Sequence, residues 1–289
     1  MSPKKILGSV VRAIGQLPGI KTVLYQPAVR GAIQTWPGFK TLYGNGWSLL
    51  HPFDRLHHTD TSGFVASEQL PSSPFDLTRK HVYGGSQPSI IRSALATLPA
   101  LDSFTFIDLG CGKGRPLLVA SEFPFRDLVG VELSPALAAD ARRNADIVRR
   151  RMPDRVPVRV EVGDAGTFPF PAGNLVVYLY NPFGEEVILK VVAGIEAALA
   201  AEQRSLFVVY YNSVHGACFD ASRSLTRYFA ATLPYAEEER GYGPDAEDMV
   251  VIWQGGSATP ARPGADAPIE VTNPSTRAGL KSHRETPPR

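Results

Sequence analysis

The chain has 289 residues, of which 44% are hydrophobic and 20% charged, an ordinary globular composition with enough apolar material for a core. Thirty basic and 28 acidic residues leave a formal charge of +2, which excludes a general attraction to nucleic acid or to an anionic membrane. Only two cysteines occur, which excludes a disulfide framework and favours a reducing, cytoplasmic location, and no apolar run of about 20 residues predicts a membrane span.

The first 87 residues divide into a helical pattern and an irregular stretch. Apolar residues recur at helical spacing from Ile6 to Leu17 and predict an amphipathic helix. From Trp36 to Gly85 the sequence is rich in glycine, proline, histidine and aromatic residues and shows no long period. A segment of this kind is more typical of a cap over a site than of a linker. Residues 1–87 are therefore expected to form an N-terminal helix and an irregular cap.

Residues 88–256 alternate apolar runs with helical patterns. Helices are predicted at Pro88–Leu98, Gly114–Glu122, Pro135–Arg151, Glu185–Ala201 and Cys218–Ala231. Strands are predicted at Phe104–Leu109, Leu128–Leu133, Val156–Val162, Leu175–Tyr180 and Leu206–Tyr211, with a terminal hairpin formed by Tyr235–Arg240 and Asp248–Gln254. Continuously apolar strands separated by helices predict an α/β fold, in which a mostly parallel sheet carries helices on both faces.

The last 33 residues differ again in composition. Residues 257–289 are rich in proline, alanine, serine, threonine and arginine and contain almost no large apolar side chain. Such a segment buries too little surface to offset the entropy lost on ordering. It is expected to be a disordered tail.

A glycine-rich loop follows the first predicted strand of the sheet, as Asp108-Leu109-Gly110-Cys111-Gly112-Lys113-Gly114. Glycines let the backbone turn tightly and approach a ligand, and the helix that follows presents unpaired N–H groups. Two more acids, Glu132 and Asp164, stand where the next two predicted strands end. Since the carboxyl ends of parallel strands meet at the crevice where open α/β sheets bind ligands, the three acids are expected to converge there. Helix N-caps or solvated loop acids are the alternative for Glu132 and Asp164.

With the pattern Asp108-x-Gly110-x-Gly112-x-Gly114 and these acids at the strand ends, residues 88–254 resemble class I (Rossmann-like, seven-strand) S-adenosylmethionine-dependent methyltransferases. The resemblance implies a seven-stranded sheet and S-adenosyl-L-methionine as the cofactor. It implies that the methionine portion lies against Asp108, Gly110, Gly112 and Gly114. It also implies Glu132 on the ribose, where an acid about 20 residues beyond the glycine loop is expected, and Asp164 near the adenine.

An NAD-dependent oxidoreductase is the alternative from another class. The nicotinamide fingerprint G-x-G-x-x-G requires glycine where this chain has Arg115, which disfavours that alternative. A catalytically silent module that binds the cofactor also stays open. No cysteine pair supports the histidines near position 57, so no metal site is expected.

The predicted strand Leu175–Tyr180 runs into Asn181-Pro182-Phe183. In N-methyltransferases of the family, an Asp/Asn-Pro-Pro-aromatic motif occupies this place, and here it is one proline short. An asparagine oxygen accepts hydrogen bonds from an amine, and an aromatic ring stacks on it. Tyr180, Asn181 and Phe183 are therefore predicted as catalytic residues for transfer to a nitrogen of a protein side chain or small molecule. A proline-containing turn that merely ends a strand is the alternative.

The stretch from Phe53 to Gly63 is dense in polar residues, and Tyr83-Gly84-Gly85 precedes the first helix of the domain. Both stretches resemble the N-terminal region of a large group of uncharacterised bacterial class I methyltransferases. The resemblance implies that Asp60, Thr61 and Tyr83 fold over the cofactor or the acceptor. A solvated loop with a turn at Ser62-Gly63 is the alternative.

Overall fold

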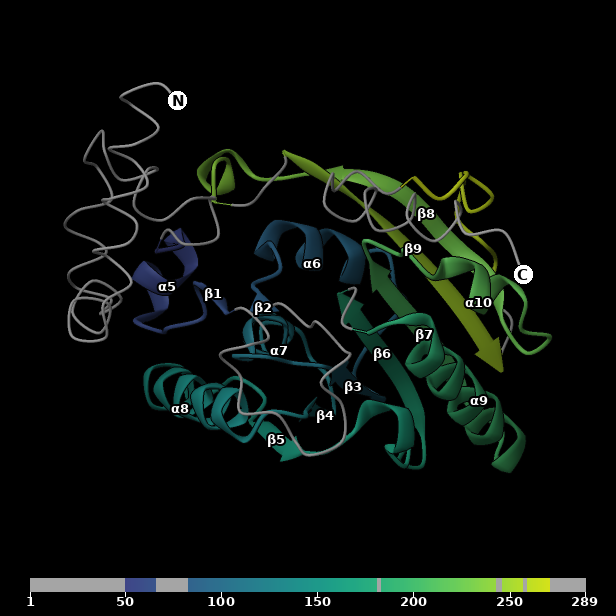
Figure 1. Cartoon of the computed structure of the whole chain (residues 1–289), viewed down its shortest axis with the longest axis horizontal. Coiled ribbons are helices and arrows are strands. Elements are labelled where there is room, and N and C mark those ends of the chain that lie inside the picture. Colours follow the sequence, from purple (N-terminus) through teal and green to yellow (C-terminus); the bar gives the residue numbers. More distant parts are fainter. Residues whose placement is uncertain (1–49, 66–82, 181–182, 243–245, 257–258, 271–289) are drawn as a thin grey trace, which may run out of the picture.

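The computed structural model describes residues 50–65, 83–180, 183–242, 246–256 and 259–270. Their centre is a seven-stranded sheet with the order β5-β4-β3-β6-β7-β9-β8 (Figure 1). Strands β3 to β7 run parallel, and β9 and β8 complete the sheet as an antiparallel pair. The strands are β3 Phe104–Leu109, β4 Asp127–Glu132, β5 Val158–Val162, β6 Asn174–Tyr180, β7 Ser205–Tyr211, β8 Thr226–Pro234 and β9 Glu247–Gly256.

Helices cover both faces of this sheet, as the apolar runs predicted. One buried cluster joins α6, α7 and α8 to side chains such as Phe106 and Tyr178, and the other joins α9 and α10 to the intervening strand positions, such as Ile107 and Leu179. The helices are α6 Pro88–Leu95, α7 Arg115–Ala120, α8 Pro135–Arg151, α9 Glu185–Ala201 and α10 Gly216–Asp220. Because successive side chains of a strand point to opposite faces, an apolar run of this kind serves both clusters.

Strand order places a topological switch between β3 and β6. From β3 the chain adds β4 and β5 on one side, and it then returns to add β6 and β7 on the other. Ligands of open α/β sheets bind outside the carboxyl ends of the strands at such a switch point. The glycine loop follows β3 at this end, where β6 also ends, at Tyr180.

The C-terminal part of the domain corrects the prediction for residues 218–240. The predicted helix Cys218–Ala231 is wrong: α10 ends at Asp220, and Thr226 already begins β8. Tyr228 and Ala230 are buried while their neighbours are more exposed, a period of two that belongs to a strand. The expected closing hairpin exists, but β8 and β9 form it, and the predicted strand Tyr235–Arg240 contains the 3-10 turn η4 Glu237–Glu239 instead.

Residues 259–270 belong to the segment expected to be a disordered tail, yet they lie against the domain. The Arg262 N–H donates to the Tyr228 carbonyl at 2.8 Å, and Arg227 donates to the Ala267 carbonyl at 2.7 Å. Ala265 is buried, and Ile269 packs against the α9 cluster. Since β8 is the last strand of the sheet, these backbone contacts cover its edge and compensate for the few apolar side chains. Residues 271–289 lie outside the described residues.

The described part of the N-terminal region is short. It contains α5 Pro52–His57 and a two-stranded antiparallel sheet of β1 Phe64–Val65 and β2 Tyr83–Gly84. The amphipathic helix predicted at Ile6–Leu17 lies outside the described residues. Among the helices that are described, none is both long and apolar enough to cross a membrane.

Candidate functional site

The glycine loop between β3 and α7 depends on its glycines. Gly110, Gly112 and Gly114 have φ values of +80°, +54° and +86°, in the left-handed region that other residues rarely adopt. The loop is fixed by backbone hydrogen bonds from Gly110 N to the Val131 carbonyl and from Gly114 N to the Cys111 carbonyl, both 2.8 Å. The strand predicted before this loop is β3, and the helix predicted after it is α7.

Glu132 ties the glycine loop to the start of α8. Its Oε2 accepts from Gly112 N and its Oε1 from Ser134 N, each at 2.8 Å. The side chain is buried, and burial raises the pKa of the carboxyl while the backbone donors partly offset that rise. Each oxygen of a carboxylate has a further lone pair, so two more donors can approach Glu132.

Asp108 lies in the same buried region, at the end of β3. Its Oδ2 has no hydrogen-bond partner within the described segments. Burial, with the nearby charge of Glu132, raises the pKa of Asp108 well above its ordinary value. An unsatisfied buried carboxyl costs free energy, and a cationic ligand beside it would offset that cost.

Asp164 behaves differently from the other two acids. It follows β5, it is exposed, and its Oδ1 accepts from Gly166 N at 2.8 Å, which caps the 3-10 turn η3 Ala165–Thr167. The N-cap alternative therefore describes its contacts in this structure. Its position at the carboxyl end of the strand next to β4 is the one predicted from the sequence.

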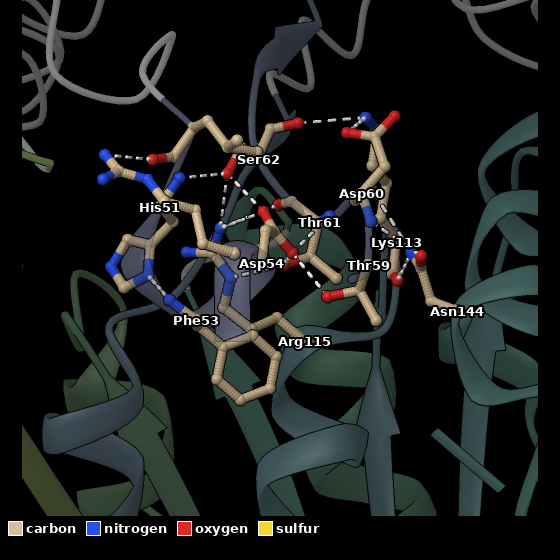
Figure 2. A network of polar contacts seen from close by, with 12 residues as sticks. His51, Phe53, Asp54, Thr59, Asp60, Thr61, Ser62, Lys113, Arg115 and Asn144 are labelled. Carbon is tan, nitrogen blue, oxygen red and sulfur yellow. Dashed lines mark hydrogen bonds and ion pairs between the residues drawn. The ribbon is translucent and has the colours of Figure 1, made fainter. Parts of the chain in front are cut away.

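Residues 51–63, here called the capping segment, are organised around one buried carboxylate. Asp54 accepts from the hydroxyl groups of Thr59, Thr61 and Ser62 and from Thr61 N (Figure 2). Arg115 forms an ion pair with it, at 3.6 Å between Nη2 and Oδ2, and both side chains are almost fully buried. Burial opposes ionisation of Asp54, but Arg115 and the hydroxyl donors outweigh it and hold the pKa below its ordinary value.

Lys113 and Arg115 fasten the capping segment to the glycine loop. Arg115 donates from Nε to Thr61 Oγ1 at 2.7 Å, from Nη2 to the Thr61 carbonyl at 3.0 Å and from Nη1 to the Ser86 carbonyl at 3.1 Å. Lys113 Nζ donates to the Ser62 carbonyl at 2.9 Å (Figure 2). Arg115 is the first residue of α7, where the helix dipole disfavours a cation, so the nearby Asp54 carboxylate compensates for its position.

Asn144, on α8, closes the network from the other side. Its Oδ1 accepts from Asp60 N, and its Nδ2 donates to the carbonyls of Asp60 and Lys113, at distances of 2.9 to 3.1 Å. The solvated-loop alternative for this stretch is therefore wrong, because the segment is held on both sides. No sequence motif singles out Asp54 or Asn144, and the density of hydroxyl residues from 59 to 62 is the signal that points to this network.

Tyr83 connects the capping segment to Gly112. Its hydroxyl donates to the Thr61 carbonyl at 2.6 Å, and the ring lies so close to Gly112 that an added Cβ would be 2.4 Å from it. Lys113 Nζ lies 5.8 Å from the ring centroid. Thr61 and Tyr83, which the sequence placed near the ligand site, are thus both beside the glycine loop.

Only two of the three residues predicted for catalysis can be placed. Tyr180 is half-buried, and its ring centroid lies 4.2 Å from that of Tyr211. Phe183 packs against the α9 cluster. Asn181 lies outside the described residues, as does Pro182.

His51 gives the capping segment a pH dependence. Its Nδ1 accepts from Phe53 N at 3.1 Å, and its Nε2 lies 2.9 Å from Gln87 Oε1. Burial and the charge of Arg115 lower the pKa of His51 from 6.5 to about 3. Because the unfolded chain binds this proton more tightly, the residue lowers stability progressively as the pH falls from about 6.5 to about 3.

We therefore expect His51→Asn to reduce the loss of unfolding free energy between pH 6.5 and pH 4, by up to about 1.4 kcal/mol per pH unit. Urea unfolding of wild type and variant across this range measures the effect, since the other titrating groups are common to both proteins. The same substitution at the exposed His58 is the control. Parallel pH profiles for wild type and His51→Asn would contradict the expectation.

Comparison with known proteins bears on this site. Residues 107–183, which begin within β3 and extend three residues beyond β6, match the family described as "Methyltransferase domain". No curated protein matches the chain. Among solved structures, it is similar to YcgJ from Bacillus subtilis, with 14% identity, a TM-score of 0.40, and 59% of this chain and 97% of that chain covered. It is also similar to TrmN from Thermus thermophilus, with 15% identity and a TM-score of 0.43. That match covers 58% of this chain and 48% of TrmN.

With TM-scores below 0.5, these two likenesses bear on neither the activity nor the acceptor of this chain. The family match is independent of them. It covers the glycine loop, Glu132 and Asp164, in a sheet with the seven strands that the resemblance implied and the closing antiparallel pair that the sequence pattern predicted. Residues 107–183 therefore match a methyltransferase domain, and the seven-stranded sheet that contains them has the form that the resemblance to class I methyltransferases implied.

Proposed function

We propose that the protein transfers a methyl group from S-adenosyl-L-methionine to a nitrogen of a protein side chain or a small molecule, with the donor bound at the carboxyl ends of β3, β4 and β5. The observation that carries this proposal is the pair of buried acids beside the glycine loop. Asp108 keeps an unsatisfied oxygen that suits a cationic group, and Glu132 keeps lone pairs that suit ribose hydroxyls. The residues present therefore fit the donor.

When bound, S-adenosylmethionine supplies an electrophilic methyl carbon. The acceptor lone pair forms the new bond to this carbon, and the carbon–sulfur bond breaks with its electron pair left on sulfur. The acceptor nitrogen then releases a proton to solvent. The protein needs little acid–base chemistry for a neutral nitrogen. It holds donor and acceptor in line and excludes water. In this assignment Gly110, Gly112, Gly114 and Asp108 receive the methionine portion, Glu132 the ribose and Asp164 the adenine.

The capping segment has a positioning role in this proposal. Through Thr61 and Tyr83 it lies against Gly112, and through Arg115 it is tied to the start of α7. It therefore fixes the loop that would hold the donor. Residues 50–65 and the domain of residues 88–256 then act as one unit, to which residues 259–270 also contribute.

A nitrogen acceptor outside nucleic acid is favoured by two observations. The formal charge of +2 provides no general attraction to polyanions. Tyr180 and Phe183 flank the asparagine whose side chain can accept hydrogen bonds from an amine, and they are the aromatic residues proposed to line its acceptor. Tyr180, Asn181 and Phe183 are accordingly proposed as the catalytic residues.

Calorimetric titration of the purified protein with S-adenosylmethionine, S-adenosylhomocysteine and NAD tests the proposal. We expect micromolar binding of the first two and no binding of NAD. Binding of NAD alone would favour the oxidoreductase alternative and overturn the proposal. If the methyl donor binds but no labelled methyl group reaches any fraction of a cell extract, the protein would be the silent binding module.

A further inference from the structure

The turn after β7 holds two buried polar side chains without partners in the described part of the chain. Asn212 and Ser213 follow Tyr211, the last residue of the strand, and are 3% and 0% exposed. Neither Asn212 Oδ1 nor Ser213 Oγ has a hydrogen-bond partner among the described residues. The backbone of the turn is satisfied, with Asn212 N donating to the Met249 carbonyl at 2.8 Å and Gly216 N to the Ser213 carbonyl at 3.0 Å. The shape of the turn therefore does not depend on these two side chains.

Asn212 also has a strained backbone. Its φ is +52°, and His58 is the only other non-glycine residue with a positive φ in the described segments. Glycine adopts this conformation at lower cost, although asparagine tolerates it better than most residues do. An alanine in place of Ser213 would remove a buried hydroxyl that has no partner. Glycine at position 212 and alanine at position 213 would thus give a more stable fold. Backbone strain of this kind is typical of sites that bind a ligand.

The turn lies at the functional end of the sheet. In the β6–β7 register, Tyr211 is opposite Tyr180, and neighbouring strands are about 4.8 Å apart. Asn212 and Ser213 therefore begin about one strand spacing from the carboxyl end of β6 at Tyr180. Strand β6 separates them from β3 and its glycine loop. The pair stands on the acceptor side of the switch point and away from the proposed donor site.

We propose that Asn212 and Ser213 bind the methyl acceptor, and that the group they hold is a neutral nitrogen that carries N–H donors. An amide oxygen only accepts hydrogen bonds, and a hydroxyl accepts and donates, so together they suit an amine or amide N–H. Neither side chain carries a positive charge to hold a carboxylate or phosphate. The inference rests on the proposed function and deepens it, because it names two acceptor-binding residues and the chemical class of the acceptor.

Hydrogen bonding through N–H leaves the nitrogen lone pair directed away from the two residues. That pair forms the bond to the methyl carbon, the carbon–sulfur bond breaks with its electrons on sulfur, and the nitrogen releases one proton to solvent. Asn212 and Ser213 orient the nitrogen and take no proton themselves. Their removal should therefore slow methyl transfer and leave donor affinity intact.

The test compares Asn212→Gly and Ser213→Ala with the wild-type chain. We expect each variant to raise the midpoint of thermal unfolding by about 2–4 °C, because strain or an unsatisfied group is removed. Transfer of labelled methyl from S-adenosylmethionine into fractionated cell extract should fall about tenfold, while calorimetric donor affinity stays unchanged. The incorporated label should survive mild alkali, which releases methyl esters as volatile methanol and leaves N-methyl groups in place.

Ser121→Ala is the matched control. Ser121 is equally buried, but its hydroxyl donates to the Leu118 carbonyl at 2.6 Å, so its loss should lower the unfolding midpoint and leave transfer unchanged. The inference is overturned if Asn212→Gly and Ser213→Ala lower stability as this control does, if they leave transfer unchanged, if they weaken donor binding, or if the label is alkali-labile. No donor binding or transfer by the wild-type chain would instead overturn the proposed function itself.

Discussion

Asp54→Asn is expected to lower the free energy of unfolding by about 3–5 kcal/mol, the loss typical of removing one partner from a buried ion pair. Arg115 would remain buried without its carboxylate, and the amide nitrogen that replaces one carboxylate oxygen could not accept from the hydroxyl side chains around it. Urea unfolding followed by circular dichroism measures the change. The capping segment is expected to loosen first, since Asp54 holds three of its hydroxyl groups.

The control is Asp146→Asn on α8, whose partner Arg149 forms an exposed i,i+3 ion pair with it. A loss of no more than about 0.5 kcal/mol is expected there. Because the pKa of Asp54 is held below its ordinary value, its contribution is present above the unfolded pKa and disappears as the pH falls through the folded one. The difference between wild type and Asp54→Asn should therefore shrink in acid. Equal losses for the two variants at neutral pH would argue against a buried, charged Asp54.

Glu132→Ala is expected to weaken S-adenosylmethionine binding at least tenfold, or about 1.4 kcal/mol. The substitution removes the proposed acceptor for the ribose hydroxyls. It also leaves Gly112 N and Ser134 N without the carboxylate that holds the glycine loop against the start of α8. Calorimetry with the methyl donor and with S-adenosylhomocysteine gives the affinities. Both ligands should lose affinity to the same degree, because they share the ribose.

Glu161→Ala on the neighbouring strand β5 is the matched control. That side chain is exposed, and it forms an ion pair with Arg159 on the same strand. Its donor affinity should equal that of the wild type. Circular dichroism of Glu132→Ala establishes that the variant is folded before it is titrated. Wild-type affinity in a folded Glu132→Ala variant would show that the ribose binds elsewhere.

Local sequence patterns predicted the sheet because its central strands are apolar throughout and its two long helices carry clear ends. Helix α8 begins after the N-cap Ser134 and ends with three arginines, and its predicted bounds agree with the structure. The region from 218 to 234 was misread because short strand and helix patterns overlap there, and pairing with β9 decides between them.

The candidate site was only partly visible in the sequence. The glycine loop and its acids form a continuous local motif. By contrast, Arg115 meets Thr61 across 54 positions and Asn144 meets Asp60 across 84, and no short-range pattern reports such contacts. In the sequence Arg115 stands out as a departure from a nicotinamide fingerprint, whereas the structure gives it a role in anchoring the capping segment.

These long separations also set an order of events during synthesis. Residues 51–63 leave the ribosome before any of the other described segments, but Asp54 cannot be buried as a paired carboxylate until Arg115 has been made. Asn144, which completes the enclosure, comes later still. Contacts between distant positions are costly to form early, because the intervening chain must be closed into a loop. The segment made first is thus among the last to become fixed. Until its partners are made, its polar side chains favour contact with water, because burying them without hydrogen bonds costs free energy.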